Sequence, residues 1–392
     1  ITTRDYRFKS RPWDNPEAVD TICTQCSKGC NVTAWIKAKP EWAKGDRLAR
    51  FTPRYNADVN GYWMCDIGRF GYHWIESDQR LRRPLIRDAA GTQQPAAWHD
   101  LTTRLRQTFA GAETRAGLRF LLSAHASNEE ILLFGRLAQG LAGDAAPSML
   151  AMSWRRQEKE QPARSKFKVP AVDAPNVNGA RDLGLNVGAG NDGTPDLAAL
   201  KADIAAGKVT ALYVFDPGPD GSLGDTRWIL DARQQGRLPL LIVQGVLMTD
   251  LANAADFVLP GASSIEKDAS YTNDQGRVQA AARVIPLPGE AREDWQILVN
   301  VADAFGVALG FASSAEVRAE IARVLAANPA YAGLADLAFA RPVSNKTWLQ
   351  ASNPSERWKW DVLFQDLPPV KGTVDPVALP RPPGAIPLKE VK

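Results

Sequence analysis

The spacing of apolar residues changes character near residue 95. Before that point the chain shows short stretches with an apolar residue at every second position, the clearest being 31–37. Such alternation predicts a strand with one buried face, and the turn residues that follow allow 47–52 to return as its partner. The first 80 residues are therefore predicted to form a small β-rich domain.

From about residue 95 onward, helical and strand patterns alternate. Apolar residues recur at helical spacing over 98–109, and a short apolar strand is predicted at 118–123. Ser127 and Glu130 have the spacing of a capping box, which starts a predicted helix over 128–141. Short apolar strands separated by helices predict a parallel sheet covered on both faces. The later members of this series are a helix over 197–206, a strand over 210–215, a helix over 223–235 and a strand over 238–243.

Turn and breaker residues define the remaining stretches. Residues 144–195 are rich in Pro, Ala, Asn and Gly without a sustained period, so they are predicted to be a long connection. Residues 270–280 alternate around Asn273 and Gly276, which predicts two short strands joined by a turn. Two helices are predicted after them, over 295–305 and 315–326.

Composition narrows the class of protein. The 392 residues are 45% hydrophobic and 23% charged, as in ordinary globular proteins, and the net charge is only +3. No dense basic run with interleaved aromatic residues occurs, so nucleic acid is not expected as a partner. The apolar runs are far too short to span a bilayer, and residues 1–30 lack the apolar segment of a signal peptide. The chain begins with Ile, which leaves processing, an incomplete start or a longer parent protein open.

The cysteines carry the strongest chemical signal. All four lie in the first 65 residues, at Cys23, Cys26, Cys30 and Cys65. Three closely spaced thiolates can each bind a separate iron of a cubane, and a distant fourth can close the remaining corner. A [4Fe–4S] cluster on these four residues is therefore predicted. Zinc and unliganded thiols are the alternatives, although zinc ribbons usually present two paired knuckles that this spacing lacks.

Aromatic residues are frequent around these cysteines. Trp35, Trp63, Tyr72 and Trp74 are predicted to pack in the core of the small domain, since buried aromatic side chains mainly contribute apolar area. The alternative is a dry shell that tunes the potential of the cluster by excluding water.

Several segments resemble the molybdopterin oxidoreductase superfamily. Residues 21–31 and 65–72, which contain the cysteines, are similar to its iron–sulfur domain, and 271–279 fits a further motif. Shorter similarities occur over 80–87, 127–130 and 258–268. Within the superfamily the chain looks most like the large iron–sulfur (G) subunit of bacterial NADH-quinone oxidoreductase, respiratory complex I. Residues 5–9 are similar to a linker of that protein, and 173–180 to a later segment.

The resemblance implies a fold and a partner class. The expected fold is α/β, with a β-rich [4Fe–4S] domain over 1–80 and a reduced molybdopterin-oxidoreductase-like domain with a parallel sheet over 81–310. A helical extension over 311–340 and an extended Trp- and Pro-rich tail over 341–392 complete the prediction, the tail docking on partner subunits. By resemblance the chain belongs to the peripheral arm of the complex, on the cytoplasmic side of the inner membrane, among NADH-oxidising and iron–sulfur subunits. It is expected to be non-catalytic alone.

Three departures from the active molybdopterin enzymes stand out. Those enzymes have Lys two residues after the fourth cysteine, where this chain has Ile67. No fifth cysteine is present as a molybdenum ligand, and the chain is short between Glu130 and Asp173. One [4Fe–4S] cluster without molybdopterin is therefore expected. The alternatives are a fragment of a molybdopterin-dependent oxidoreductase of the formate dehydrogenase kind, and an architectural subunit stapled by zinc.

Overall fold

The structure is a computed structural model that describes residues 15, 17–37, 47–187 and 196–344. The described residues up to Val343 cluster into one compact unit. The predicted tail over 345–392 lies outside the described residues, and the predicted boundaries at residues 80 and 310 stay predictions.

A small antiparallel sheet opens the described chain. It pairs β1 (Glu17–Ile22), β2 (Asn31–Ile36) and β3 (Leu48–Pro53) in that order, with the two-residue β13 (Val343–Ser344) at its edge. The predicted hairpin of β2 and β3 is confirmed, and its alternating apolar residues form a buried core. The strand β1 was not predicted from the sequence, because Glu17 and Asp20 interrupt its pattern.

The second sheet has seven strands in the order β5-β4-β10-β9-β8-β6-β7. The five strands from β10 to β7 are parallel, and β4 and β5 add an antiparallel edge. The predicted parallel sheet is thus confirmed. The strands are β4 (Leu85–Arg87), β5 (Gln93–Pro95), β6 (Leu118–Ser123), β7 (Leu150–Ser153), β8 (Ala211–Asp216), β9 (Leu240–Gly245) and β10 (Phe257–Pro260).

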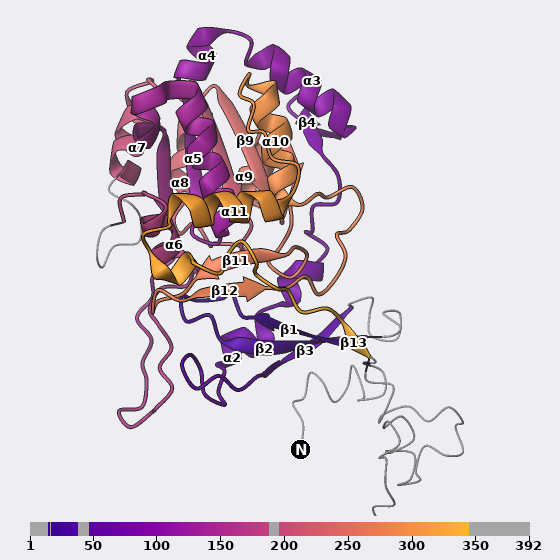
Figure 1. Ribbon diagram of the computed structural model, residues 1–392. Helices are drawn as coiled ribbons and strands as arrows, with labels where there is room; N and C mark the ends of the chain where they lie inside the picture. Colours follow the sequence, from indigo (N-terminus) through magenta and orange to yellow (C-terminus); the bar gives the residue numbers. More distant parts are fainter. Residues whose placement is uncertain (1–14, 16, 38–46, 188–195, 345–392) are drawn as a thin grey trace, which may run out of the picture. The chain divides into compact units, whose positions relative to one another are not determined.

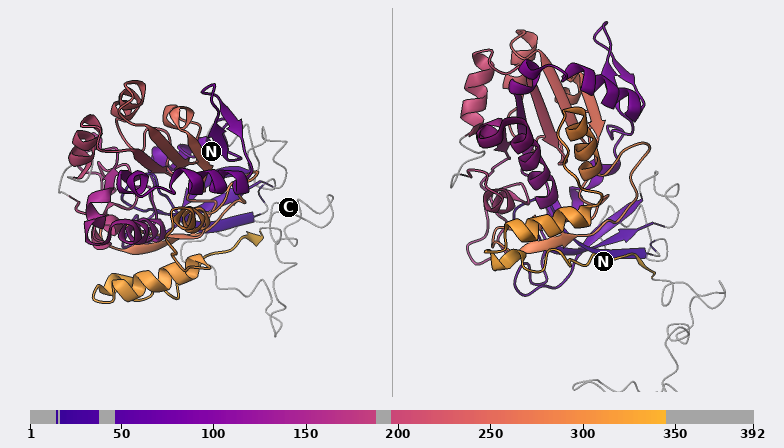
Figure 2. Two further views of the ribbon diagram at one scale, coloured as in Figure 1. Left: turned by 90° about the horizontal axis from the view of Figure 1, so that it is seen from above. Right: turned by 45° about the horizontal axis from the view of Figure 1, so that its top comes forward.

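Helices cover both faces of this sheet, as Figures 1 and 2 show. On one face α3 (Trp98–Thr108), α5 (Asn128–Ala142) and α10 (Asp294–Ala304) share a core with the strands. On the other face α7 (Asp196–Ala205), α8 (Arg227–Gln234) and α9 (Asp250–Ala254) form a second core. Because β6, β8 and β9 are buried on both sides, their apolar runs are nearly continuous.

Further helices pack around this body. Val317 and Ile321 of α11 (Ser314–Val324) are buried in the core that contains α5, so this predicted helix belongs to the α/β layer. The other short elements are α2 (Asp66–Phe70), η3 (His73–Glu76), α4 (Ala112–Ala116), η4 (Gly143–Met149), α6 (Val177–Asp182) and η5 (Pro329–Tyr331).

Two predictions need correction. The stretch 144–195 is not an irregular connection throughout, since it holds η4, β7 and α6; β7 is only four residues long and is formed by pairing with β6, which its sequence period does not reveal. Trp63 is not a core residue, because its side chain is 63% exposed after a tight turn in which its backbone N–H bonds to the carbonyl of Asn60. Tyr72 does pack in the core, as predicted.

A separate hairpin joins the two sheets. It consists of β11 (Ala269–Thr272) and β12 (Val278–Ala281), and the predicted turn between them is confirmed, with Gly276 at φ 74°. Figure 1 shows the hairpin between the α/β body and β1. Ile22 of β1 packs with three buried hairpin residues, Ala269, Tyr271 and Ala281. Among the described residues, none of the helices has both the length and the apolar character needed to cross a bilayer.

The aromatic cluster under α5 gives the first prediction. The Phe134 side chain is fully buried and contacts the rings of Phe120, Tyr213 and Phe215. Phe134→Ala is expected to lower the free energy of unfolding by about 3–5 kcal/mol, because the lost contacts leave a cavity. Urea denaturation measures this loss. Val324→Ala, at an exposed position, is the control and should change stability by less than about 0.5 kcal/mol; an equal effect of both variants would contradict the assignment of this core.

Candidate metal centre

The first three cysteines lie on the loop between β1 and β2. The backbone N–H of Cys23 donates to the carbonyl of Cys30 at 2.8 Å, which closes the loop at its base. Gly29 has φ 64°, a left-handed conformation that glycine adopts without strain. The loop therefore curls back on itself, with Cys23, Cys26 and Cys30 along the bend.

The fourth cysteine reaches the same place from another element. Cys65 caps the N-terminus of α2, and its Sγ accepts a hydrogen bond from the backbone N–H of Gly68 at 3.4 Å. A Cβ atom built on Gly68 would lie 2.9 Å from Sγ of Cys23 and 3.9 Å from Sγ of Cys65. Gly68 thus lies between these two thiols, and its lack of a side chain lets them approach. The structure brings Cys65 to the loop that carries the other three cysteines.

The environment of Cys23, Cys26 and Cys30 disfavours negative charge on their thiols. Burial raises the pKa of Cys23 well above its usual value, and the neighbouring Cys26, Cys30 and Cys65 raise it further. Burial likewise raises the pKa of Cys26 to about 11 and that of Cys30 to about 12. No cysteine is in a disulfide. Thiolates at these positions need a bound cation to compensate their charge, which is the condition that a metal centre supplies.

Four thiols can bind either of two kinds of metal centre. One zinc ion draws four sulfurs to about 2.3 Å from a single centre. In a cubane each thiolate binds its own iron, so the sulfurs stand farther apart. Among the described residues, no three His, Cys, Asp or Glu side chains already surround one point as they would around a single ion.

The hairpin β11–β12 holds the cysteine loop through three consecutive carbonyl groups. The backbone N–H of Asp274 donates to the carbonyl of Ser27 at 2.7 Å. The side-chain amide of Asn273 donates to the carbonyl of Lys28 at 3.2 Å, and that of Gln279 donates to the carbonyl of Gly29 at 3.0 Å. All three donors belong to the motif 271–279 that the sequence singled out. Their role here is to fix the shape of the loop.

The hairpin is in turn fixed by the first turns of two helices. Both carboxylate oxygens of Glu129 accept from the backbone N–H of Ser270, at 3.1 and 3.0 Å. Oδ1 of Asn176, the residue before α6, accepts from the backbone N–H of Thr272 at 2.8 Å. Asn128 donates to the hydroxyls of Ser270 and Thr272. The segments 127–130 and 173–180 therefore brace the hairpin.

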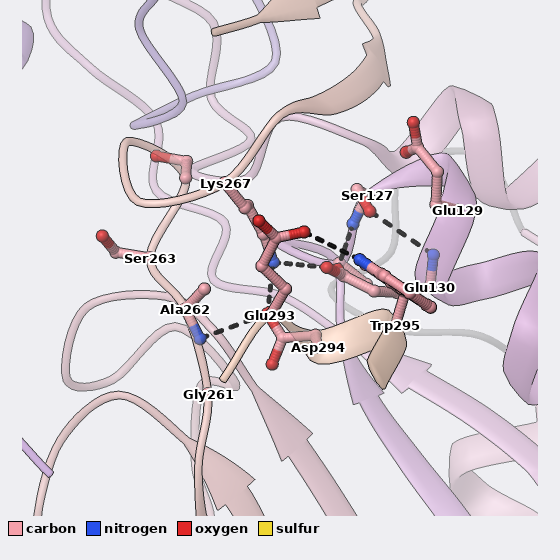
Figure 3. Close-up of polar contacts among 12 residues, drawn as sticks. Ser127, Glu129, Glu130, Gly261, Ala262, Ser263, Lys267, Glu293, Asp294 and Trp295 are labelled. Atoms are coloured by element: carbon pink, nitrogen blue, oxygen red, sulfur yellow. Dashed lines mark hydrogen bonds and ion pairs between the residues drawn. The ribbon is translucent and has the colours of Figure 1, made fainter. Parts of the chain in front are cut away.

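Buried ion pairs lie near the braced hairpin β11–β12. Lys267 lies between Glu130 and Asp294, and its Nζ bonds to Asp294 at 2.6 Å and also to Glu130 (Figure 3). Arg80 and Glu266 form a second buried pair at 2.7 Å. The capping box predicted for Ser127 and Glu130 is confirmed, so one Glu130 oxygen caps α5 while the other pairs with Lys267.

The charges of this network are set by burial and by each other. Burial raises the pKa of Glu130 to about 7, against the opposing effect of Lys267. Burial alone would lower the pKa of Lys267, but Asp294 and Glu130 together raise it well above its ordinary value. We conclude that Lys267 stays cationic and compensates two carboxyl groups that water cannot reach.

Comparison with protein families gives two matches. Residues 16–77 match the molybdopterin oxidoreductase Fe4S4 domain, and residues 174–304 match molybdopterin oxidoreductase. The segment with the four cysteines is therefore similar to the iron–sulfur domain of the molybdopterin oxidoreductases, and much of the α/β body is similar to a second part of these proteins.

The relatives narrow this class. The second G-type subunit of NADH-quinone oxidoreductase in Rhizobium meliloti is 38% identical over 132 residues, which are 34% of this chain and 14% of that protein. The mitochondrial NADH-ubiquinone oxidoreductase 78 kDa subunit of Neurospora crassa is 22% identical over 84% of this chain and 57% of its own length. The predicted resemblance to the large iron–sulfur subunit is confirmed by these relatives. The chain spans less than two thirds of the length of either relative.

The chain is also similar to a formate dehydrogenase subunit in sequence and to one solved structure. An alpha subunit of a formate dehydrogenase from Methanococcus maripaludis is 37% identical over 142 residues, which are 36% of this chain and 20% of that protein. Among solved structures, acetylene hydratase from Pelobacter acetylenicus has a TM-score of 0.44 and 10% identity, covering 76% of this chain and 71% of that chain.

Sequence reasoning found the cysteines but not their support. Glu130 stands out in the sequence through the capping box, and the segments around Lys267 and over 271–279 stand out only as family similarities. Nothing in the sequence marks Asp294. The burial of Lys267 has no signal in the sequence, because Glu266 and Asp268 flank it as they would an exposed Lys.

The ion-pair network generates the second prediction. Lys267→Met leaves Glu130 and Asp294 buried without their cation and should cost about 3–5 kcal/mol of stability. Burial raises the pKa of Glu130, and loss of Lys267 removes the opposing effect, so Glu130 of the folded variant takes up a proton at low pH. The loss should therefore be larger at about pH 8 than at about pH 5. Urea denaturation at the two pH values measures it. Arg106→Met, at an exposed ion pair, should have little effect at either pH; equal losses in the two variants would count against the network.

Gly29 provides the third prediction. A Cβ atom there would lie 2.2 Å from Oε1 of Gln279, so Gly29→Ala displaces the side-chain amide that bonds to the carbonyl of Gly29. Gly276 also has positive φ, but a Cβ atom there would meet nothing within 4 Å. Both alanines carry the backbone cost of about 1–2 kcal/mol, and only Gly29→Ala should also impair metal retention. Thermal melting and the rate of iron loss to a chelator distinguish them, and identical behaviour of the two variants would refute the contact.

Proposed function

We propose that this chain is an iron–sulfur subunit of the peripheral arm of NADH:quinone oxidoreductase, and that Cys23, Cys26, Cys30 and Cys65 bind one [4Fe–4S] cluster. The observation that carries the proposal is the proximity of these four thiols within the segment that matches the Fe4S4 domain. When bound, the cluster supplies one-electron transfer. The chain itself binds the cluster, excludes water from Cys26 and Cys30, and holds the loop in shape.

The partners follow from the relatives. Two of them are named as subunits of NADH-quinone and NADH-ubiquinone oxidoreductases, so we propose that this chain assembles with NADH-oxidising and iron–sulfur subunits of such a complex. It then sits at the cytoplasmic face of the inner membrane without a catalytic site of its own. NADH oxidation and quinone reduction belong to other subunits in this proposal.

We propose further that this chain binds no molybdopterin. Ligands of such sheets bind beyond the carboxyl ends of the strands, and here a cavity of about 700 Å³ lies beyond β8 and β9. Its lining includes four carboxyl groups and a single cation, Arg227. A pyrophosphate-bearing pterin nucleotide would be repelled by this charge. The lining acids are Asp216, Asp220, Asp225 and Asp250.

The link between cluster and pterin is also missing. Where active members of the superfamily have Lys, this chain has Ile67, whose side chain is 48% exposed. Asp216 is occupied within the fold, since it accepts hydrogen bonds from Ser222 and from the backbone N–H of Gly218. We therefore favour the respiratory subunit over a formate dehydrogenase fragment.

Metal analysis tests the proposal, as the fourth prediction. After anaerobic reconstitution the chain should hold about four iron and about four sulfide, and reduction should give the EPR signal of a [4Fe–4S] cluster. Cys65→Ser should lose the cluster, whereas the adjacent Asp66→Asn should retain it. One zinc without iron would support the architectural alternative, and stoichiometric molybdenum the formate dehydrogenase alternative. Co-purification with NADH-oxidising activity tests the assembly, and a stable lone chain would contradict it.

A further inference from the structure

Exposed apolar side chains gather beside the fourth cysteine. Seven large hydrophobic residues are exposed in the described chain, and five of them lie between residues 55 and 70. Two of the five, Tyr62 and Trp63, are 73% and 63% exposed. We call these five residues the aromatic patch: Tyr55, Tyr62, Trp63, Ile67 and Phe70.

The fold makes no use of these side chains. The rings of Tyr55 and Tyr62 stack on each other at 4.4 Å, outside the four hydrophobic cores. In α2 the only buried residue is Gly68, so the helix turns its glycine toward the cysteines and leaves Ile67 and Phe70 exposed. Exposed apolar clusters of this kind mark contact surfaces, in which Tyr and Trp are enriched.

The patch and the metal centre share the helix α2. Ile67 and Phe70 of the patch belong to this helix, and Cys65 caps its N-terminus. Gly68 of the same helix separates the thiols of Cys65 and Cys23. These two cysteines are the partly exposed ones, whereas Cys26 and Cys30 are buried. The side of the cysteine site that is nearest to solvent is therefore the side that carries the patch.

A basic loop borders the same centre. Residues 161–172 contain three cations and no acid. Phe167 of this loop packs against the core cluster that holds Cys30 and Met64, and the amine of Lys28 lies 5.3 Å above its ring. The backbone N–H of Ser27 donates to the carbonyl of Val172 at 3.1 Å. The loop is thus fixed to the cysteine loop, and we call it the basic loop.

Its cations are available to a partner. Arg164, Lys166 and Lys168 are exposed, and no carboxyl group of the described chain forms an ion pair with them. The amine of Lys168 donates to the carbonyl of Pro162, which leaves its charge uncompensated. An apolar centre flanked by free positive charge fits a partner with an apolar centre flanked by acids.

We propose that the aromatic patch and the basic loop form a docking face for an acidic protein that carries one electron. The proposal rests on the proposed [4Fe–4S] cluster and adds where and with what chemistry it exchanges electrons. The reduced iron centre of the carrier gives one electron to the oxidised cluster, so the carrier is oxidised, the cluster is reduced, and no bond forms or breaks. The patch brings the two centres close, and the loop steers the acidic carrier.

Binding to a probe of this chemistry tests the docking face. The full reconstituted chain is titrated with an acidic plant-type [2Fe–2S] ferredoxin, and with basic cytochrome c as the comparison. One variant reverses the loop charge (Arg164→Glu, Lys166→Glu and Lys168→Glu), and another removes two rings (Tyr62→Ser and Trp63→Ser). The matched control reverses three exposed cations elsewhere, by Arg104→Glu, Lys201→Glu and Arg227→Glu.

We expect the ferredoxin to bind in preference to cytochrome c, and added salt to weaken its binding. Each face variant should bind about tenfold more weakly, and the control within about twofold of the unaltered chain. Absence of ferredoxin binding, or face variants that bind as the unaltered chain does, would overturn the docking face. Equal binding of anionic vesicles or DNA, in competition with ferredoxin, would also overturn it by showing attraction to polyanions only.

The iron and sulfide content of each sample separates this proposal from the previous one. A chain that binds no iron refutes the cluster, whatever its affinity for ferredoxin. A chain that holds a full cluster but does not bind ferredoxin refutes only the docking face.

Discussion

Three consecutive carbonyl groups, those of Ser27, Lys28 and Gly29, accept hydrogen bonds from one hairpin. A loop that carries three thiols has to satisfy its backbone polar groups while it bends around the metal, and these bonds do so for three of its carbonyls. They also link the small sheet to the α/β body, since the hairpin rests on α5 and α6. The geometry of the metal centre therefore depends on residues about 250 positions away in sequence.

The same dependence explains the buried charges. Glu129 and Glu130 lie in the first turn of α5, where the helix dipole favours acids. Glu129 bonds to the hairpin, and Glu130 pairs with Lys267, two residues before the hairpin starts. In an oxidoreductase fold a buried Lys beside two carboxyl groups invites a catalytic interpretation. Here every one of these groups has a structural partner, since Lys267 pairs with Asp294 and with Glu130, and Glu130 also caps α5.

Much of this could be predicted from the sequence. The strand at 118–123, the capping box at Ser127 and the turn at Asn273 follow from local rules, and the structure has them. The four cysteines are distinctive by spacing alone. Two features could not be predicted from the local sequence. The strand β7 depends on its pairing with β6, and α8 starts four residues later than predicted because packing decides where it begins. The exposure of Trp63 was missed because residue type alone predicts burial. The hydrogen bond of Gln279 joins segments far apart in the chain, so no pattern in the sequence around Gln279 predicts it.

The central claim is that the α/β body shapes the cysteine loop before any metal arrives. Amide hydrogen exchange on the iron-free chain tests it most directly. We predict that the β11–β12 amides of Ser270 and Thr272, and the amide of Asp274 that bonds to the loop, stay protected in the absence of iron. If these amides exchange as freely as unfolded chain until iron is added, then the metal shapes the loop and the central claim is contradicted.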